Sequence, residues 1–259
     1  MRKIGFNVFC GIEDEKLYPL AKEAGFDAFF SSPHLAKDLA ALTELKQFAE
    51  ANGLVQETVH STIDNCRSVW WDGPEGDQYI DILLKNIEHC RILGIPILVV
   101  HPQCDRLGGY DVALGLSRLD RVVEAAGLAG IQIAFENIDS AELLNAVMER
   151  YQEPHVGFCY DTGHECWLTP DAHWLRKYGD RLLCTHFNDN DRTGDLHWIP
   201  YDGAADFDSI CRDMRNSRKP ETISIELGFS EKYSLVMTEK EFLEKCYSVM
   251  RNIADKIDD

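Results

Sequence analysis

Residues that can bind a cation or transfer a proton follow several of the short apolar runs in this chain. The run Val156 to Tyr160 is rich in β-forming residues and is followed directly by Asp161, with Gly163 and His164 close behind. An aspartate at the end of a buried strand needs a partner, because burying an unpaired carboxylate is costly in free energy. The other acids and imidazoles in equivalent positions are His60, His101, Glu136, His186 and Glu226.

Carboxylates and imidazoles together form a mixed oxygen and nitrogen ligand set that suits Mn²⁺, Zn²⁺, Co²⁺ or Mg²⁺. We therefore interpret the chain as an arrangement that brings four of these side chains around one divalent metal ion. The four residues are Glu136, Asp161, His186 and Glu226. A single histidine after a strand is weak evidence for a site, whereas six polar strand ends together require a common explanation.

Such a site requires strands whose carboxyl ends meet, and the sequence pattern predicts eight strands. Short apolar runs alternate with longer segments whose apolar residues recur at helical spacing. The predicted strands are Ile4–Phe9, Phe26–Phe30, Leu54–Val59, Ile95–Val100, Ile131–Phe135, Val156–Tyr160, Leu182–Thr185 and Thr222–Ile225. The predicted helices are Asp14–Ala24, Leu35–Ala51, Gln78–Leu93, Asp111–Ala129, Ala141–Tyr151, Pro170–Tyr178, Phe207–Asn216 and Phe242–Ile257. This alternation indicates an α/β fold, a single (β/α)8 TIM barrel over residues 1–259, with its active site at the C-terminal ends of the strands.

Composition disfavours several classes of protein. The formal net charge of −18 disfavours tight binding to nucleic acid, whose phosphates must be met by Lys and Arg. No apolar run approaches the roughly 20 residues that span a bilayer, and the N-terminal run is too short for a secretory signal, so we expect no membrane association. The nine cysteines form no C-x-x-C pair, which argues against a disulfide framework and favours a reducing, cytoplasmic location.

Four motifs resemble the xylose isomerase-like TIM-barrel superfamily, and the resemblance extends over essentially the whole chain. The motifs are Glu136-Asn137 after the fifth predicted strand, Asp161-Thr162-Gly163-His164 after the sixth, His186-Phe187-Asn188-Asp189-Asn190 after the seventh and Glu226 after the eighth. That superfamily contains sugar isomerases, ketose 3-epimerases, inosose dehydratases and AP endonucleases. The resemblance implies a divalent-metal-dependent sugar isomerase or epimerase, or a related dehydratase, that acts on a ketose or polyol.

The resemblance to ketose epimerases also implies a role for each residue. The four strand-end residues named above would bind the metal, and two of them, Glu136 and Glu226, would also move a proton next to a carbonyl through an enediolate. A cation on the substrate oxygens stabilises that charge, and a carboxylate on each face can remove or return a proton. The residues that would bind the substrate are His60, His101, His164 and Arg192.

The AP endonuclease branch gives a different interpretation. In those enzymes an Asp-x-His pair binds one of three zinc ions, and Asp195 and His197 form such a pair here. His60 and His101 also match that set, so three zinc ions and a phosphodiesterase are the alternative. Against this, Gly163 stands where the nucleases have Cys, no Ser-Lys follows the strand-seven motif, and a net charge of −18 suits duplex DNA poorly.

A third interpretation is a non-catalytic barrel that binds a metal ion or a sugar, and four protein ligands with no open position would favour it. The sequence does not identify the sugar or polyol, and no glycine-rich phosphate loop supports a phosphorylated one. We expect a small-molecule partner, without nucleic acid or membrane, and a homo-oligomer remains open.

Overall fold

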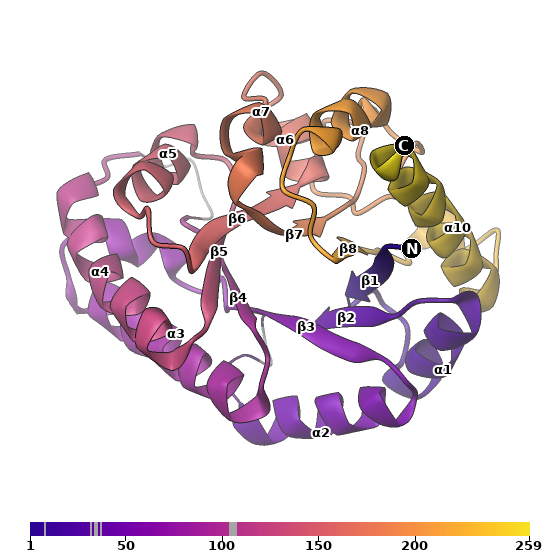
Figure 1. The fold of residues 1–259 in the computed structure, drawn as a ribbon, viewed down its shortest axis with the longest axis horizontal. Helices are drawn as coiled ribbons and strands as arrows, with labels where there is room; N and C mark the ends of the chain where they lie inside the picture. Colours follow the sequence, from indigo (N-terminus) through magenta and orange to yellow (C-terminus); the bar gives the residue numbers. More distant parts are fainter. Residues whose placement is uncertain (8, 32, 34–35, 37, 104–107) are drawn as a thin grey trace.

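Eight parallel strands form a barrel in the computed structural model, which describes residues 1–7, 9–31, 33, 36, 38–103 and 108–259 (Figure 1). The strands are β1 (Lys3–Asn7), β2 (Ala28–Ser31), β3 (Val55–His60), β4 (Ile97–Val100), β5 (Gln132–Glu136), β6 (Val156–Asp161), β7 (Leu182–His186) and β8 (Thr222–Ile225). Neighbouring strands pair in the order β7-β6-β5-β4-β3-β2-β1-β8. The predicted (β/α)8 barrel is therefore confirmed.

The barrel closes between β7 and β8 just beyond the regular pairing. Phe187 forms a parallel bridge with Ile225. The Phe187 amide donates to the carbonyl oxygen of Ser224 at 2.8 Å, and the Glu226 amide donates to that of Phe187, also at 2.8 Å. Because His186 precedes Phe187, this closure brings His186 and Glu226 together at the same end of the barrel.

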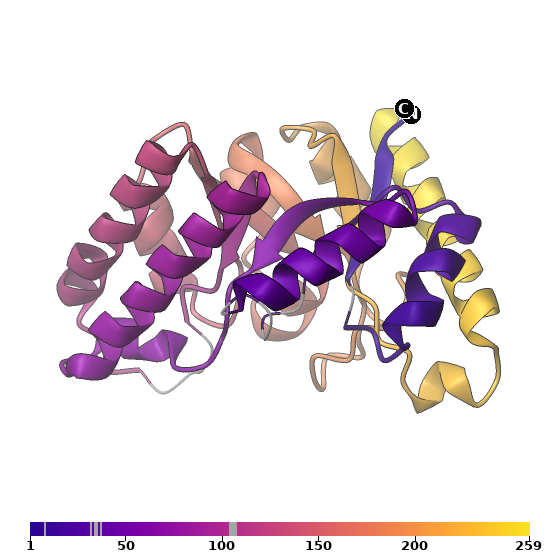
Figure 2. The same ribbon diagram turned by 90° about the horizontal axis from the view of Figure 1, so that it is seen from below.

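Helices surround the strands on the outside of the barrel (Figures 1 and 2). The α-helices are α1 (Asp14–Ala24), α2 (Leu39–Ala51), α3 (Pro74–Leu93), α4 (Val112–Ala129), α5 (Ala141–Arg150), α6 (Thr162–Leu168), α7 (Trp174–Tyr178), α8 (Phe207–Arg215), α9 (Glu231–Ser234) and α10 (Glu239–Asp258). The structure also has 3₁₀ segments at η2 (Cys66–Trp70) and η3 (Gly179–Arg181). The chain termini lie side by side (Figure 2), where Arg2 pairs with Asp258 at 2.6 Å.

Helix capping explains where α2 begins. The sequence predicts a helix from Leu35, a residue outside the part of the chain that the structure describes. The described helix begins at Leu39, because the Asp38 carboxylate accepts hydrogen bonds from the amides of Ala40 and Ala41 at 2.9 and 3.1 Å. The first-turn amides are thereby satisfied by a side chain that precedes the helix.

The predicted helix Pro170–Tyr178 is wrong at its start. The structure instead has two helices, α6 directly after Asp161 and α7 from Trp174. Asp161 caps α6, because its carboxylate accepts a hydrogen bond from the amide of His164 at 2.6 Å. A candidate metal ligand thus also starts a helix.

Other element ends also differ from the prediction, and α3 begins at Pro74 instead of Gln78. Strand β1 ends at Asn7 instead of Phe9, and Val8 lies outside the described residues. Helix α10 begins about one turn early, because Thr238 and Glu241 form a capping box.

The structure also describes the cysteines and the apolarity of the helices. Among the described residues, seven cysteines are free and buried, whereas Cys66 is disulfide-bonded, which the sequence pattern does not predict. Within residues 1–7, 9–31, 33, 36, 38–103 and 108–259, none of the helices is both long and apolar enough to cross a membrane.

Candidate metal centre

Four polar side chains converge at the C-terminal rim of the barrel. Glu136, Asp161 and His186 end the adjacent strands β5, β6 and β7, and Glu226 follows β8. One ligand atom from each residue lies within 4.8 Å of the ligand atoms of the other three. All four are buried, with exposed fractions of 0%, 0%, 1% and 6% respectively. The structure thus brings together the four residues predicted to hold a divalent ion.

His186 occupies the middle of this cluster. Its Nδ1 lies 3.2 Å from Oε1 of Glu136 and 3.5 Å from Oε2 of Glu226. The imidazole stacks on the ring of Phe30, with centroids 4.3 Å apart and planes 11° apart. This stacking fixes the ring so that Nδ1 faces both carboxylates.

Asp161 is held by two asparagines that the sequence analysis did not assign. Asn137 donates to the Asp161 carbonyl at 2.7 Å, and its side-chain oxygen accepts from the Asp161 amide at 2.8 Å. Asn188 Nδ2 donates to Oδ2 of Asp161 at 2.7 Å. A Cβ at Gly163 would lie 1.7 Å from Oδ1 of Asn188, so only glycine fits there. Both asparagines belong to the strand-end motifs of the sequence. Their places beside Glu136 and His186 are the sequence feature that could have identified them as partners of the ligands.

The four groups strongly perturb one another's ionisation. Burial raises the pKa of the Asp161 carboxyl to about 8, although the His164 imidazole opposes that shift. Burial alone would lower the pKa of His186, but Glu136 and Glu226 raise it to about 10. Burial also opposes ionisation of Glu136, yet His186 and His101 hold its pKa well below the usual value. Both Asp161 and His186 therefore hold a proton more tightly than the free side chains do.

These observations fit a divalent cation. Three carboxylates and an imidazole meet in one buried place, and buried carboxylates need a compensating charge. The His186 Nε2 is buried without a hydrogen-bond partner within the described residues. Oxygen and nitrogen donors of this kind suit Mn²⁺, Mg²⁺, Co²⁺ and Zn²⁺, and a bound ion would replace the protons on Asp161 and His186.

A second group of possible ligands shares Glu136. One ligand atom each from His60, His101 and Glu136 also lies within 4.8 Å of the others. The His60 Nε2 is 3.4 Å and the His101 Nε2 3.3 Å from Oε2 of Glu136. The His60 Nδ1 donates to the Ser61 carbonyl at 2.8 Å, which turns Nε2 toward the Glu136 carboxylate. This orientation is typical of histidines that bind a metal.

A third group lies on the other side of His164. The His164 Nδ1 is 3.3 Å from Oε1 of Glu136, and its Nε2 is 3.3 Å from Oδ2 of Asp195. The His197 Nε2 is 3.2 Å from Oδ1 of Asp195 and 3.9 Å from Oε1 of Glu226. Burial lowers the pKa of His197, but Glu226 and Asp195 more than offset this and raise it to about 9. The two possible additional ligands, Asp195 and His197, are therefore adjacent to the main cluster.

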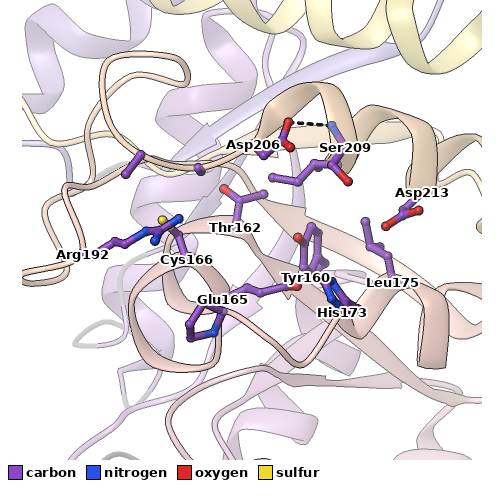
Figure 3. Close-up of a pocket in the computed structure, with 14 residues that line it drawn as sticks. Tyr160, Thr162, Glu165, Cys166, His173, Leu175, Arg192, Asp206, Ser209 and Asp213 are labelled. Atoms are coloured by element: carbon purple, nitrogen blue, oxygen red, sulfur yellow. Dashed lines mark hydrogen bonds between the residues drawn. The ribbon is translucent and has the colours of Figure 1, made fainter.

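Arg192 lies in a different pocket. Its side chain lines a cavity of about 160 Å³ together with Cys166, Glu165 and Asp206, next to α6 and α8 (Figure 3). Burial raises the pKa of the Cys166 thiol, and the neighbouring Arg192 guanidinium opposes that shift. Within the described part of the chain, Arg192 makes no hydrogen bond or ion pair to the four clustered residues. Its predicted contact with substrate stays a prediction.

Comparison with known sequences identifies the family. Residues 19–246 match the family model described as the xylose isomerase-like TIM barrel. An uncharacterized protein, y4fM, of Sinorhizobium fredii (strain NBRC 101917 / NGR234) is 28% identical over 192 residues, which are 69% of this chain. The match spans 61% of that protein's length.

Solved structures share the fold at low sequence identity. A D-tagatose 3-epimerase-like protein superposes with a TM-score of 0.79 at 17% identity, over 99% of this chain and 98% of the other. D-psicose 3-epimerase from Clostridium cellulolyticum H10, solved with D-tagatose, gives 0.77 at 14% identity over 98% and 99%. The IOLI protein with a bound zinc atom gives 0.75 at 16% identity over 98% of each chain. With a family model matched over most of its length, the chain belongs to the xylose isomerase-like TIM-barrel family.

Proposed function

We propose that this protein is a metal-dependent isomerase or epimerase that acts on a ketose or polyol by moving a proton next to a carbonyl. Glu136, Asp161, His186 and Glu226 would hold one divalent ion, Mn²⁺, Zn²⁺, Co²⁺ or Mg²⁺. When bound, the ion would supply the positive charge that stabilises an enediolate of the substrate. Family membership and the sugar epimerases among the structural neighbours support this class of reaction.

The observation that carries the proposal is the placement of two glutamates, from different strands, beside the same ring nitrogen of His186. Glu136 comes from β5 and Glu226 follows β8, and each has an oxygen within 3.5 Å of Nδ1 of His186. Two other strands, β6 and β7, separate them around the rim. The carboxylates can therefore approach a central substrate from different sides, so that one removes a proton and the other returns one.

Histidines around the two glutamates would bind and orient the substrate. His101 and His164 lie within 3.3 Å of different oxygens of Glu136, so each has a ring beside a proton-transfer group. His60 packs edge-on against His101, with ring centroids 4.7 Å apart. Donors fixed in this way stabilise charge where it develops on the substrate oxygens. Arg192 would act from the neighbouring pocket.

Deuterium exchange tests the reaction. Candidate ketoses are incubated with protein and Mn²⁺ or Co²⁺ in D₂O, and entry of deuterium beside the carbonyl is followed. We expect Glu136→Gln and Glu226→Gln to slow exchange by about 10²–10⁴-fold, the typical effect of losing a general acid or base. Glu149→Gln, an exposed glutamate on α5, is the matched control and should exchange at the parent rate.

The result that contradicts the mechanism is exchange at the parent rate in both site variants with metal bound. If no ketose exchanges, the next substrates to test are cyclic polyol ketones, because their dehydration begins with the same proton abstraction.

The second candidate function is a phosphodiesterase with three zinc ions. The group of His60, His101 and Glu136, and the contacts of Asp195 with His164 and His197, favour it. Metal analysis of protein purified without chelator separates the candidates, since one equivalent supports the isomerase and three support the phosphodiesterase. We expect negligible cleavage of DNA with abasic sites, because the net charge of −18 opposes binding to duplex DNA. Cleavage of that DNA at about 1 per second or faster would favour the phosphodiesterase over the isomerase.

A further inference from the structure

Two thiols lie in the barrel interior one layer below the candidate ligands. Cys159 on β6 precedes Asp161 by two residues, and Cys184 on β7 precedes His186 by two residues. The two cysteines pair directly across the strands, and both are free and buried. They pack in a small apolar cluster with Val99. The thiol sulfurs of Cys159 and Cys184 are therefore further possible metal ligands, one layer below the oxygen and nitrogen donors.

Only one of these two thiols is placed to share an ion with the site. The Cys159 sulfur, one oxygen of Glu136 and one ring nitrogen of His186 all lie within 4.8 Å of one another, and all three residues are buried. Cys184 belongs to no such group among the residues that the structure describes. Zinc lies about 2.3 Å from sulfur and about 2.0–2.2 Å from nitrogen or oxygen, so one ion contacts all three once these atoms close around it.

The histidine in this group has a nitrogen left for a ligand. The Nδ1 of His186 faces Glu136 and Glu226. Its Nε2 has no hydrogen-bond partner in the described part of the chain, although His186 is only 1% exposed. A buried polar atom without a partner is costly, and a cation beside the ring would remove that cost.

We propose that Cys159, Glu136 and His186 form a second position for a thiophilic divalent cation, such as Zn²⁺, Cd²⁺ or Co²⁺. Thiolate ligands select soft cations, whereas carboxylates and water suit Mn²⁺ and Mg²⁺. On binding, a sulfur–metal bond forms and the thiol proton passes to solvent, without oxidation or reduction. The inference rests on the proposed metal centre, because Glu136 and His186 belong to both positions. A thiophilic ion at this position therefore competes with Mn²⁺ for Glu136, the carboxylate that both positions share.

Cobalt is the probe, because a cobalt–sulfur bond adds near-ultraviolet charge-transfer absorption that oxygen and nitrogen ligands do not give. Protein stripped of metal by a chelator under reducing conditions is titrated with Co²⁺ and, separately, with Cd²⁺. Cys159→Ser and Cys159→Ala test the ligand, and Cys184→Ser is the matched control from the same layer. Circular dichroism checks that each variant is folded.

We expect the sulfur band in the wild type and in Cys184→Ser but in neither Cys159 variant. We also expect Cd²⁺ to bind the Cys159 variants at least about tenfold more weakly, since even an outer partner of a ligand is worth about 10–100-fold. Visible cobalt absorption without a sulfur band in the wild type would overturn the inference and leave the metal centre intact. A band that survives loss of Cys159 would overturn it in favour of another cysteine. Failure to bind Co²⁺ at all would overturn both the inference and the proposed metal centre.

Discussion

Replacing Gly163 with alanine should weaken metal binding without removing any ligand. A Cβ at this position would lie 1.7 Å from Oδ1 of Asn188, so the Asn188 side chain must move. Asn188 is 0% exposed, and its Nδ2 holds Oδ2 of Asp161 at 2.7 Å. The displaced asparagine can no longer orient the Asp161 carboxylate toward an ion.

Gly163→Ala should change two free energies, that of folding and that of metal binding. Inserting a methyl group into a packed interior typically costs about 1–3 kcal/mol of folding free energy. Loss of a hydrogen bond that orients a metal ligand typically lowers affinity by about 10–100-fold, which is about 1.4–2.8 kcal/mol of binding free energy. Gly163→Ala should therefore lose both stability and metal affinity.

A double-mutant cycle tests the stated cause. Mn²⁺ affinity is measured by calorimetry for the wild type, Gly163→Ala, Asn188→Ala and the double variant, and stability is measured by urea unfolding with chelator present. Asn188→Ala removes the atom that the new methyl group would meet, so the double variant should resemble Asn188→Ala alone. The coupling between the two positions should be about 0.5–3 kcal/mol.

Gly179→Ala is the control, because its Cβ would meet the Ser217 hydroxyl oxygen at 2.2 Å, in contact with none of the four clustered residues. It should change stability and leave Mn²⁺ affinity unaltered. Fully additive effects of the Gly163 and Asn188 substitutions would refute the reasoning, because the two residues would then act independently.

Three further predictions concern the ligands and their surroundings. His186→Ala should lose stoichiometric metal in elemental analysis while circular dichroism shows a retained fold; metal that remains would identify another imidazole ligand. Because Asp161, with a pKa of about 8, and His186, with a pKa of about 10, must lose protons to bind an ion, Mn²⁺ affinity should rise as pH rises. Mn²⁺ affinity should rise about 100-fold per pH unit below pH 8 and about tenfold per pH unit above it. An Mn²⁺ affinity that calorimetry finds independent of pH would contradict these raised pKa values. Arg192→Ala should leave metal affinity within about twofold, since Arg192 lines the neighbouring pocket; a larger loss would place it at the metal.

The four-residue metal centre could be predicted because its residues all lie at strand ends, and the periodicity of apolar residues locates the strands. Apolar runs of strand length alternate with helical patterns, and the closed barrel brings all strand ends to one rim. Glu136 and His186 are far apart in the chain, yet the topology places their side chains 3.2 Å apart. Their convergence therefore follows from the number and order of elements, which sequence patterns specify well.

Other features depend on details that a one-dimensional pattern does not contain. The start of α6 was missed because Asp161 was interpreted only as a ligand and not also as a helix cap. Arg192 has a left-handed backbone conformation, with φ of 69°, which the sequence does not indicate. Cys159 carries no ligand motif in the sequence, and only the register of β6 beside β7 places it near Glu136 and His186.

A crystal structure of the Mn²⁺-loaded protein, with an anomalous difference map at the manganese edge, tests the central claim most directly. We expect one strong peak among Glu136, Asp161, His186 and Glu226, at about 2.0–2.3 Å from their ligand atoms, with a coordination position open to solvent or substrate. A peak elsewhere, or none in protein that binds one equivalent of Mn²⁺ in solution, would contradict the proposal that these four residues hold the ion.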